Sequence, residues 1–474
     1  MIFAIFSQAF AAPLSIEEAV DLAMKYNPQL QRVNYELEST ESQVLSAKAI
    51  FDPNLTASAG RNFSTQQQFF AGFGIVNTEF FGPTWAVGSS FTLPTGGSIS
   101  LDWTTSQNKS RYTLEDVQID DQQINPYDTR LSLNISHNLL DGFGLKNNRQ
   151  GVTSAERSVE IARLSLQSTQ QQILADVASA YWSAHYQYQL LSIATESIRI
   201  AEEEARVVAA QVEEGNLAPV EADRVEAARL SSMSAAADAE QAFFTSLDSL
   251  SLIIGKGLGT DVQLSSTPNA PSAIEMTLAS AQQNADRQSP LLRQAEYAVE
   301  EAQDQLRLAR NKRLPTLSAN AQYGLNGWEE ELSDAINEML DASLPSSFIG
   351  LNLSVPARRL ASKGELGQRI ANLETAKIDL QSQKQSLQQQ VSAQHRILKA
   401  SLIKIELAGA NLKVAESTLQ ADRALRDAGR AIEKDVLNSA NAVDEAKSQL
   451  EKALADYQLA QIEMDRLTGE LVAP

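Results

Sequence analysis

Two stretches of this chain carry the same pattern of residues. Residues 27–59 read NPQLQRVNYELESTESQVLSAKAIFDPNLTASA, and residues 289–321 read SPLLRQAEYAVEEAQDQLRLARNKRLPTLSANA. The matching positions all differ by one offset, 290 − 28 = 262. They include Pro28 and Pro290, Tyr35 and Tyr297, and Pro53 and Pro315. An internal repeat of this kind predicts that one folding unit is written twice in the chain.

A second match further along supports the duplication. Gly215 pairs with Gly429 and Gly255 pairs with Gly469, both at an offset of 214. The two offsets differ by 262 − 214 = 48, so the first half carries about 48 extra residues. We therefore predict a first repeat over residues 13–270 and a second over 271–474.

Long helices are predicted in each half. Residues 147–212 contain no proline, and apolar residues recur there every seven positions, as they do over 363–426. Sustained heptads are typical of coiled-coil packing, and about 65 residues of helix span roughly 100 Å. Shorter helices are expected over 14–48, 220–254, 272–311 and 431–467. Two short helices in line would match the length of one long helix.

Helix boundaries are marked by caps and prolines. Ser15 with Glu18 three residues later is the pattern of a capping box, which predicts a helix start. Pro53 and Pro315 are expected at helix–strand junctions, because proline cannot continue a helical hydrogen-bond ladder. Gly215 and Gly429 are expected just past helix ends, where glycine supplies a positive φ.

Strands are predicted from alternating apolar and polar residues. The first half has four such segments, near 53–61, 84–93, 97–105 and 129–138, and the second half has two, near 315–324 and 347–356. Between them lie predicted loops at 62–83, 106–128 and 325–346. The alternation fits a membrane barrel with an apolar outer face, and it equally fits a soluble sandwich. Three copies of six strands would give a barrel of 18 strands. If the middle pair of strands in the first half is instead a soluble hairpin outside the barrel, three copies would give 12 strands.

Loop 62–83 is rich in phenylalanine, with six in its 22 residues. Aromatic residues gather at membrane interfaces, so an interfacial girdle is the favoured interpretation. A surface binding patch is the alternative.

Composition excludes several classes of protein. The net charge is −20, from 59 acidic and 39 basic residues, which opposes the positive field that nucleic acid requires. The chain has no cysteine, so disulfides and cysteine-based zinc sites are excluded. The chain contains no run of 18 apolar residues, so no transmembrane helix is predicted. Residues 1–12 end in a small-residue A-x-A pattern and are interpreted as the remnant of a secretory signal peptide.

A catalytic site is not indicated. His137, His185 and His395 are far apart in the sequence, and no metalloprotease, Walker or dinucleotide-binding motif occurs. We predict no catalytic residue, no metal and no cofactor.

The chain resembles the TolC family of outer-membrane efflux and secretion channels. The two-half layout carries the resemblance, together with three stretches: SAYWSAHYQYQLLSIATESI from Ser179, EEGNLAPVEADRVEAA from Glu213 and the segment from Asp427 to Gly469. It extends over about residues 14–470. It implies a mainly helical fold in which long coiled-coil helices form a periplasmic α-barrel and the strands join a trimeric β-barrel in the outer membrane. The family pattern has 12 strands, so the extra pair departs from it.

The resemblance also implies partners and a gate. The expected partners are two further copies of the chain, a periplasmic adaptor, an inner-membrane pump of the RND or ABC type and outer-membrane lipid, but no nucleic acid. The helical hairpin tips at Gly215 and Gly429 would dock the adaptor. The implied gate and selectivity residues are Asp435, Asn438, Glu221, Arg426 and Arg430. A solvated surface charge is the alternative for Asp435, and Arg426 or Arg430 is the expected partner of Glu221.

The sequence thus favours a passive exit duct of a tripartite efflux pump or type I secretion system. A structural coiled-coil protein of the periplasm or cell surface is the alternative, and a periplasmic enzyme is the weakest one.

Overall fold

The computed structural model describes residues 13–70, 74–107, 109–114, 117–118, 126–215, 217–258, 262–268, 276–428, 430 and 432–471. The chain divides into two compact units, and both draw on both halves of the sequence. The helical unit comprises residues 1–38, 161–296 and 379–474, and the sheet unit comprises residues 39–160 and 297–378. The interpretation of residues 1–12 as a signal remnant falls outside the described residues.

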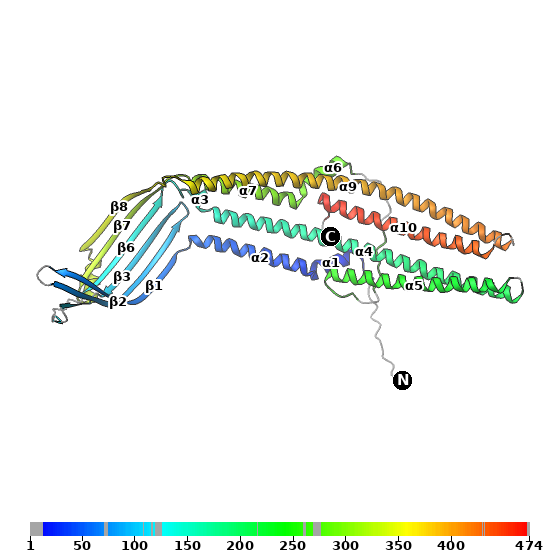
Figure 1. The fold of residues 1–474 in the computed structure, drawn as a ribbon, viewed down its shortest axis with the longest axis horizontal. Coiled ribbons are helices and arrows are strands. Elements are labelled where there is room, and N and C mark those ends of the chain that lie inside the picture. The colour runs from blue at the N-terminus through cyan, green and yellow to red at the C-terminus, as the bar shows by residue number, and fades with distance from the viewer. Residues whose placement is uncertain are drawn as a thin grey trace, which may run out of the picture. The chain divides into compact units, whose positions relative to one another are not determined.

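The long helices form as predicted. Helix α4 runs over Gln150–Glu213 and α9 over Leu360–Asp427, and the shorter α5 (Pro219–Ile254) and α10 (Glu433–Thr468) follow them. Figure 1 shows that α4–α5 and α9–α10 are hairpins whose turns lie at the same end of the helical unit. Within the described ranges, no helix is both long enough and apolar enough to cross a lipid bilayer.

The opening helix of each half is broken, which the sequence interpretation missed. Helix α1 (Ile16–Tyr26) is followed by α2 (Pro28–Lys48) and the 3₁₀ turn η1 (Ala49–Phe51), and α6 (Leu278–Gln288) is followed by α7 (Pro290–Asn311). Each break comes immediately before a proline, whose missing N–H cannot continue the ladder. The predicted capping box at Ser15 and Glu18 is confirmed.

The side chain of Asn27 fixes the first of these breaks. Its Nδ2 donates to the carbonyl of Ile253 at 2.6 Å, and its Oδ1 accepts from the backbone N–H groups of Gln29 and Leu30. Asn27 therefore caps α2 and ties it to the end of α5. Gly255, the C-cap of α5 with φ +78°, lies so close to Tyr26 and Pro28 that a Cβ there would collide with them.

A pair of equivalent hydrogen bonds shows the duplication within the helical unit. The buried Tyr181 hydroxyl donates to the carbonyl of Leu14 at 2.9 Å. In the second half, His395 Nε2 lies 3.3 Å from the carbonyl of Met276. The positions differ by 276 − 14 = 262 and 395 − 181 = 214, the two offsets of the sequence repeat. Each long helix thus holds the chain segment that leads into the opening helix of its own half.

The six predicted strands all join one antiparallel sheet. They are β1 (Asn54–Phe70), β2 (Gly74–Leu93), β3 (Gly97–Gln107), β6 (Tyr127–Asn138), β7 (Thr316–Glu329) and β8 (Leu344–Ser354). They pair in the order β1-β2-β3-β6-β7-β8, and β4 (Lys109–Leu114) and β5 (Val117–Gln118) extend the sheet beside β2. The middle pair β2–β3 lies between β1 and β6, so it is part of the sheet and not a separate soluble hairpin.

Two predicted loops were wrong. Residues 62–70 continue β1 and residues 74–83 belong to β2, and the two strands form one long hairpin in which Phe63 pairs with Phe81. Residues 325–346 hold the end of β7, the helix α8 (Leu332–Leu340) and the start of β8. The predicted loop 106–128 includes β4 and β5, and part of it lies outside the described residues. Phe73 also lies outside them, and the aromatic girdle stays a prediction.

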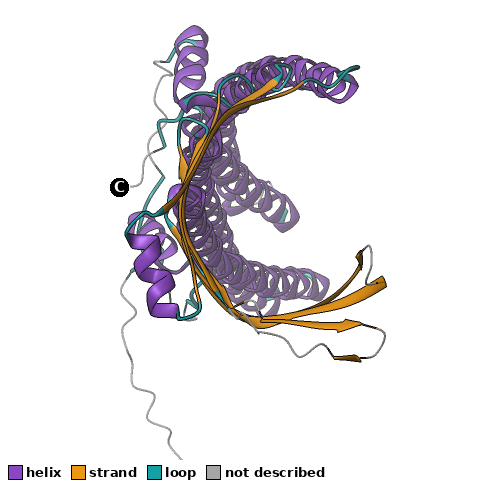
Figure 2. Cartoon of the chain, turned by 90° about the vertical axis from the view of Figure 1, so that its left-hand side faces the viewer, coloured by secondary structure: helices purple, strands orange, loops and turns teal. Residues whose placement is uncertain are grey.

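The sheet has one apolar and one polar face. Leu101, Leu133 and Tyr323 are neighbours across β3, β6 and β7, and the next row on the other face is Ser100, Asn134 and Gln322. Figure 2 shows that the sheet is curved, with a short helix against its convex side. That helix is α8, whose contacts with Gly327 place it on the face that carries Tyr323. The convex face is therefore the apolar one.

Candidate functional site

The tips of the two helical hairpins carry the residues that the sequence singled out. At the first tip, Gly215 has φ +79° and its N–H donates to the carbonyl of Val212 at 3.0 Å. At the second, the N–H of Arg430 donates to the carbonyl of Leu425 at 2.8 Å. Gly429 lies outside the described residues. Gly215 thus closes α4 in the left-handed conformation expected of a helix C-terminus.

Asp435 lies in the first turn of α10 and is exposed to solvent. Its carboxylate accepts a hydrogen bond from the N–H of Ile432 at 3.4 Å. A carboxylate near a helix N-terminus is also favoured by the helix dipole. Asn438 is one turn further along α10 and is likewise exposed. Asp435 therefore has a local capping role in addition to any role in a pore.

Two ion pairs within the single chain lie near the tips. Glu221 binds Arg224, three residues along α5, at 2.7 Å. Arg426 Nη1 binds the carboxylate of Glu204 at 2.8 Å. Within the single chain Glu221 thus pairs with Arg224, one helical turn away, at the spacing where opposite charges meet. The expected gate contact of Glu221 with Arg426 or Arg430 stays a prediction.

The Arg426–Glu204 pair connects the two halves of the chain. Arg426 is in the last turn of α9 and Glu204 is in α4, so the pair joins the long helices of the two repeats near their tips. Their side chains are only 23% and 12% exposed, which protects the pair from the screening that weakens surface ion pairs. Sequence reasoning missed Glu204, because nothing distinguishes it from its neighbours Glu202 and Glu203.

Pro53 and Pro315 lie at the junctions between a helix and the strand that follows it. Pro53 directly precedes β1 and Pro315 directly precedes β7. In both halves the helix ends a few residues earlier, at Phe51 in η1 and Asn311 in α7.

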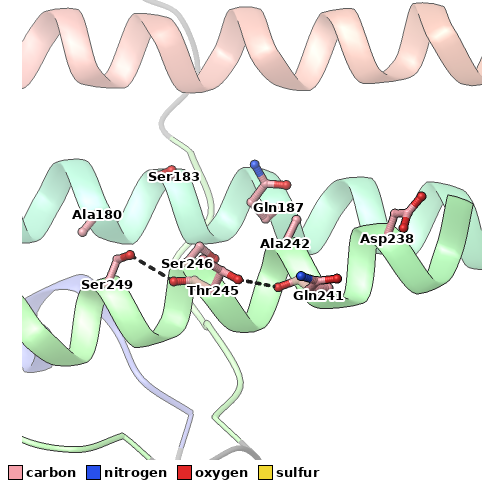
Figure 3. Close-up of a pocket in the computed structure, with 9 residues that line it drawn as sticks. All are labelled: Ala180, Ser183, Gln187, Asp238, Gln241, Ala242, Thr245, Ser246 and Ser249. Atoms are coloured by element: carbon pink, nitrogen blue, oxygen red, sulfur yellow. Dashed lines mark hydrogen bonds between the residues drawn. The ribbon is translucent and has the colours of Figure 1, made fainter.

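A groove of about 530 Å³ runs between α4 and α5 in the helical unit. Figure 3 shows small and polar side chains along it, with the hydroxyls of Thr245 and Ser249 donating to carbonyls of their own helix. Asp238 is its single titratable residue. The groove therefore offers a shallow packing surface and no arrangement of groups for catalysis.

Among the described residues, no cluster of three or more histidine, aspartate or glutamate side chains is arranged to hold a metal ion. His137, His185 and His395 lie on β6, α4 and α9.

A half-buried carboxyl group at the end of α10 has an unusual pKa. Burial raises the pKa of Asp465 to about 6, and the charge of Glu470 adds to the rise. An unfolded aspartate releases its proton near pH 4. The folded chain binds more protons than the unfolded chain between these values, so stability falls as the pH rises from about 4 to about 6.

Replacing Asp465 with asparagine should therefore stabilise the protein above pH 6. We expect a gain of about 1–2 kcal/mol at pH 8, allowing for solvent screening, and almost none at pH 4. Thermal unfolding of both proteins at a fixed concentration would measure this. Asp248→Asn, an exposed site on α5, is the control, and an equal gain from it would contradict the prediction.

A curved sheet with one apolar face, in a chain that also forms long helical hairpins, indicates an outer-membrane channel protein. The model of the outer membrane efflux protein family matches residues 19–256 and 281–470. The chain belongs to this family.

Curated relatives and solved structures agree with this assignment. The chain is 24% identical to the outer membrane protein TolC of Salmonella enteritidis over 371 residues, 76% of this chain and 73% of that protein. It is 22% identical to the outer membrane efflux protein BepC of Brucella suis biovar 1 (strain 1330) over 350 residues, 72% of each. Its fold is similar to that of the Campylobacter jejuni CmeC outer membrane channel, with a TM-score of 0.70 at 14% identity over 96% of this chain and 85% of that one.

Proposed function

We propose that three copies of this chain form a passive exit duct across the outer membrane, serving an efflux pump or a type I secretion system. The main observation that supports this proposal is the sheet. Its apolar convex face suits lipid and its polar concave face suits a water-filled lumen. Within the described residues, β1 and β8 each pair on one side only. In a bilayer their open edges must be paired, because unsatisfied backbone groups are costly in lipid.

The helical hairpins would reach into the periplasm, and their tips at Gly215 and Gly429 would meet a periplasmic adaptor and an inner-membrane pump of the RND or ABC type. The pump would supply the energy, because the chain has no recognisable nucleotide-binding or catalytic motif. Adaptor contacts would then open a nearly balanced gate by favouring its open state.

The position of β2–β3 favours a barrel of 18 strands. Because this pair is hydrogen-bonded to β1 on one side and to β6 on the other, it cannot leave the wall without breaking the sheet. Three copies of six strands give 18. Barrel diameter grows roughly linearly with strand number, so the lumen would be about 1.5 times as wide as that of a 12-stranded barrel.

Cysteine cross-linking tests this closure, because the chain has no cysteine of its own. Single cysteines along β1, each combined with Leu353→Cys on β8, should give disulfide-linked trimers of about 155 kDa in native membranes, three times 51.6 kDa. Leu101→Cys on the central strand β3, combined with Leu353→Cys, is the control and should give none. Trimers from the control, or a soluble monomer, would contradict the proposal.

Asp435 is proposed to make the pore end selective for cations, since carboxylates that converge from three subunits attract them. Asp435→Asn removes the charge and keeps an oxygen that caps α10. We expect the ratio of cation to anion permeability in planar bilayers to fall, with the trimer intact. Asp248→Asn is the control for a lost surface charge. An unchanged ratio in Asp435→Asn would leave capping as the role of this residue.

A further inference from the structure

Two arginines meet at the corner of the sheet where β7 and β8 join the helices. Figure 1 shows that α7 leads into β7 and that β8 leads into α9 at the same place. The Nη1 of Arg359 donates to the carbonyl of Arg313 at 3.4 Å. Arg359 also has φ +49°, a left-handed conformation that is unfavourable for residues other than glycine. Strain of this kind is typical of binding sites, where the surrounding structure maintains it.

Cations outnumber acids at this corner. Residues 310–317 and 353–365 contain six cations and one acid. That acid, Glu365, binds Lys312 at 3.1 Å, and Asp141 of the neighbouring connection interacts electrostatically with the same lysine. Among the residues that the structure describes, no carboxylate binds the three corner arginines, which are Arg313, Arg358 and Arg359. In a chain with a net charge of −20, three arginines without an acidic partner indicate an anion that comes from outside the chain.

The cations of this corner are not required by the junction between helix and strand. The equivalent of Arg313 in the first half is Phe51, since 313 − 262 = 51, and the equivalent of Lys312 is Ile50. The first junction therefore forms with apolar residues where the second carries cations, so the cations serve a purpose other than the turn itself.

The corner lies just beyond the apolar face of the sheet. Leu353 of β8 is on that face opposite Leu317 of β7, and it is 61% exposed. The nine residues from Leu317 to Leu325, tilted by about 45°, rise roughly 21 Å, close to the height of about 25 Å of a barrel's apolar band. Leu317 and Leu353 therefore mark the boundary of the band on the side of the helices. Arg313 and Arg358 lie four and five residues beyond it (317 − 313 and 358 − 353).

Apolar side chains stand among these cations. Leu314, Val355 and Leu360 are 45%, 49% and 65% exposed. Such side chains gain little from a water-filled lumen, whereas at a membrane boundary they contact the ends of acyl chains. Arginine suits the same boundary, because its apolar stem lies along hydrocarbon while its guanidinium reaches the headgroups.

A neighbouring subunit would not neutralise the corner. In the proposed trimer, β8 lies next to β1 of another copy, whose junction over residues 48–53 contains Lys48 and Asp52. Lys48 binds Glu156 of its own chain at 3.3 Å. Asp52 is the single acid of that junction, so an excess of positive charge remains at the three corner arginines.

We propose that Arg313, Arg358 and Arg359 bind the phosphate of phosphatidylglycerol, or of another phospholipid with a net negative charge, in the leaflet nearest the helices. The guanidinium fork matches the geometry of phosphate oxygens. A zwitterionic phospholipid also carries an ammonium group, which the same arginines would repel, so the site should prefer the anionic lipid. The proposal rests on the proposed function, because it requires the apolar face to meet lipid.

Native mass spectrometry of the lipids that the trimer retains tests the proposal. The trimer is released from nanodiscs of equal parts phosphatidylglycerol and phosphatidylethanolamine with identical acyl chains, and the ratio of the two bound lipids is measured. We expect phosphatidylglycerol to be retained in about fivefold excess or more. Replacing the three corner arginines with glutamine should lower this ratio to less than about twofold. Arg358→Gln alone removes no contact within the described residues and should lower the ratio in part.

Three lysines of α9 provide the matched control. Lys399, Lys404 and Lys413 are exposed and belong to the helical unit, so replacing all three with glutamine removes the same charge at a distance from the corner. This change should leave the lipid ratio as it is. Asp52→Asn should likewise change neither the ratio nor the trimer, and inorganic phosphate in the buffer should not displace the lipid.

Equal retention of the two lipids by the starting protein, or a preference that survives the arginine replacements, would overturn the proposal and leave the barrel in the membrane. Displacement by inorganic phosphate would overturn it in favour of a free anion. Dissociation of the trimer both by Asp52→Asn and by the arginine replacements would assign the arginines to the subunit contact. A changed ratio of cation to anion permeability with an unchanged lipid ratio would assign them to the lumen. A trimer that retains neither lipid would contradict the proposed function itself.

Discussion

Replacing Arg157 with alanine is expected to cause a large loss of stability in the sheet unit. Arg157 is on α4, its side chain is 11% exposed, and it faces three acids of α7. Its guanidinium pairs with Glu301, and with Asp304 at 2.8 Å. Burial alone would lower the pKa of Arg157, but the hydrogen bond and charge of Asp304 and the charge of Glu301 outweigh it and raise the pKa.

Without the guanidinium, Glu301 would lose its cationic partner, and Asp304 would be left with Arg307, which binds it at 2.6 Å. Glu301 and Asp304 are 28% and 17% exposed. Removing one partner of a buried ion pair costs about 3–5 kcal/mol, and we expect the lower end of this range because Asp304 keeps Arg307 and Glu301 is partly exposed. Hydrogen exchange of the amides in α7 should therefore become about a hundredfold faster or more.

Arg199→Ala is the matched control. Arg199 is also on α4 and binds Glu196 at 2.6 Å, but its side chain is 62% exposed. Water screens an exposed pair, which therefore contributes little to stability, so its removal should change exchange in α4 less than tenfold. Similar effects from both replacements would show that the Arg157 cluster does not hold α7 to α4.

The sequence was most informative where the pattern is local. Heptads gave α4 and α9 to within a few residues, because every turn of a long helix repeats the same apolar seam. Alternation located all six strands for the same reason. Gly255 and Gly469 were paired from the repeat alone, and both adopt a positive φ at helix ends.

It was least informative where a contact joins distant parts of the chain. The break after α1 depends on Asn27 reaching Ile253, which is 226 residues away, and no periodicity signals it. Helix α8 lies on the sheet because Gly327 leaves room for it, which is a property of the packed structure. The predicted first two strands were too short because residues 62–83 do not alternate clearly in the sequence, although residues 62–70 pair with residues 74–82 in the structure.

The tip ion pairs show the same limit. Arg426 was singled out, but its partner depends on the rotation of α9 relative to α4. Glu204 is 222 positions from Arg426 in the sequence, so only the fold identifies the pair.

Replacing Arg426 with alanine is expected to increase channel opening. In the proposed trimer, the Arg426–Glu204 pair holds the two hairpins of each subunit together near the closed end. A partly buried pair that contributes about 1.4 kcal/mol to the closed state changes the ratio of open to closed channels about tenfold. Single-channel recordings in planar bilayers at fixed voltage would measure the open probability directly.

Two further variants separate the pair from a general effect of charge. Exchanging the charges, with Arg426→Glu and Glu204→Arg together, should restore a low open probability, whereas either change alone should raise it. Glu226→Ala is the control, because Glu226 binds Arg229 on its own helix α5 and is not among the expected gate residues. If Glu226→Ala opened the channel as much as Arg426→Ala, or if the exchanged pair stayed open, the closing contact would not be the one between Arg426 and Glu204.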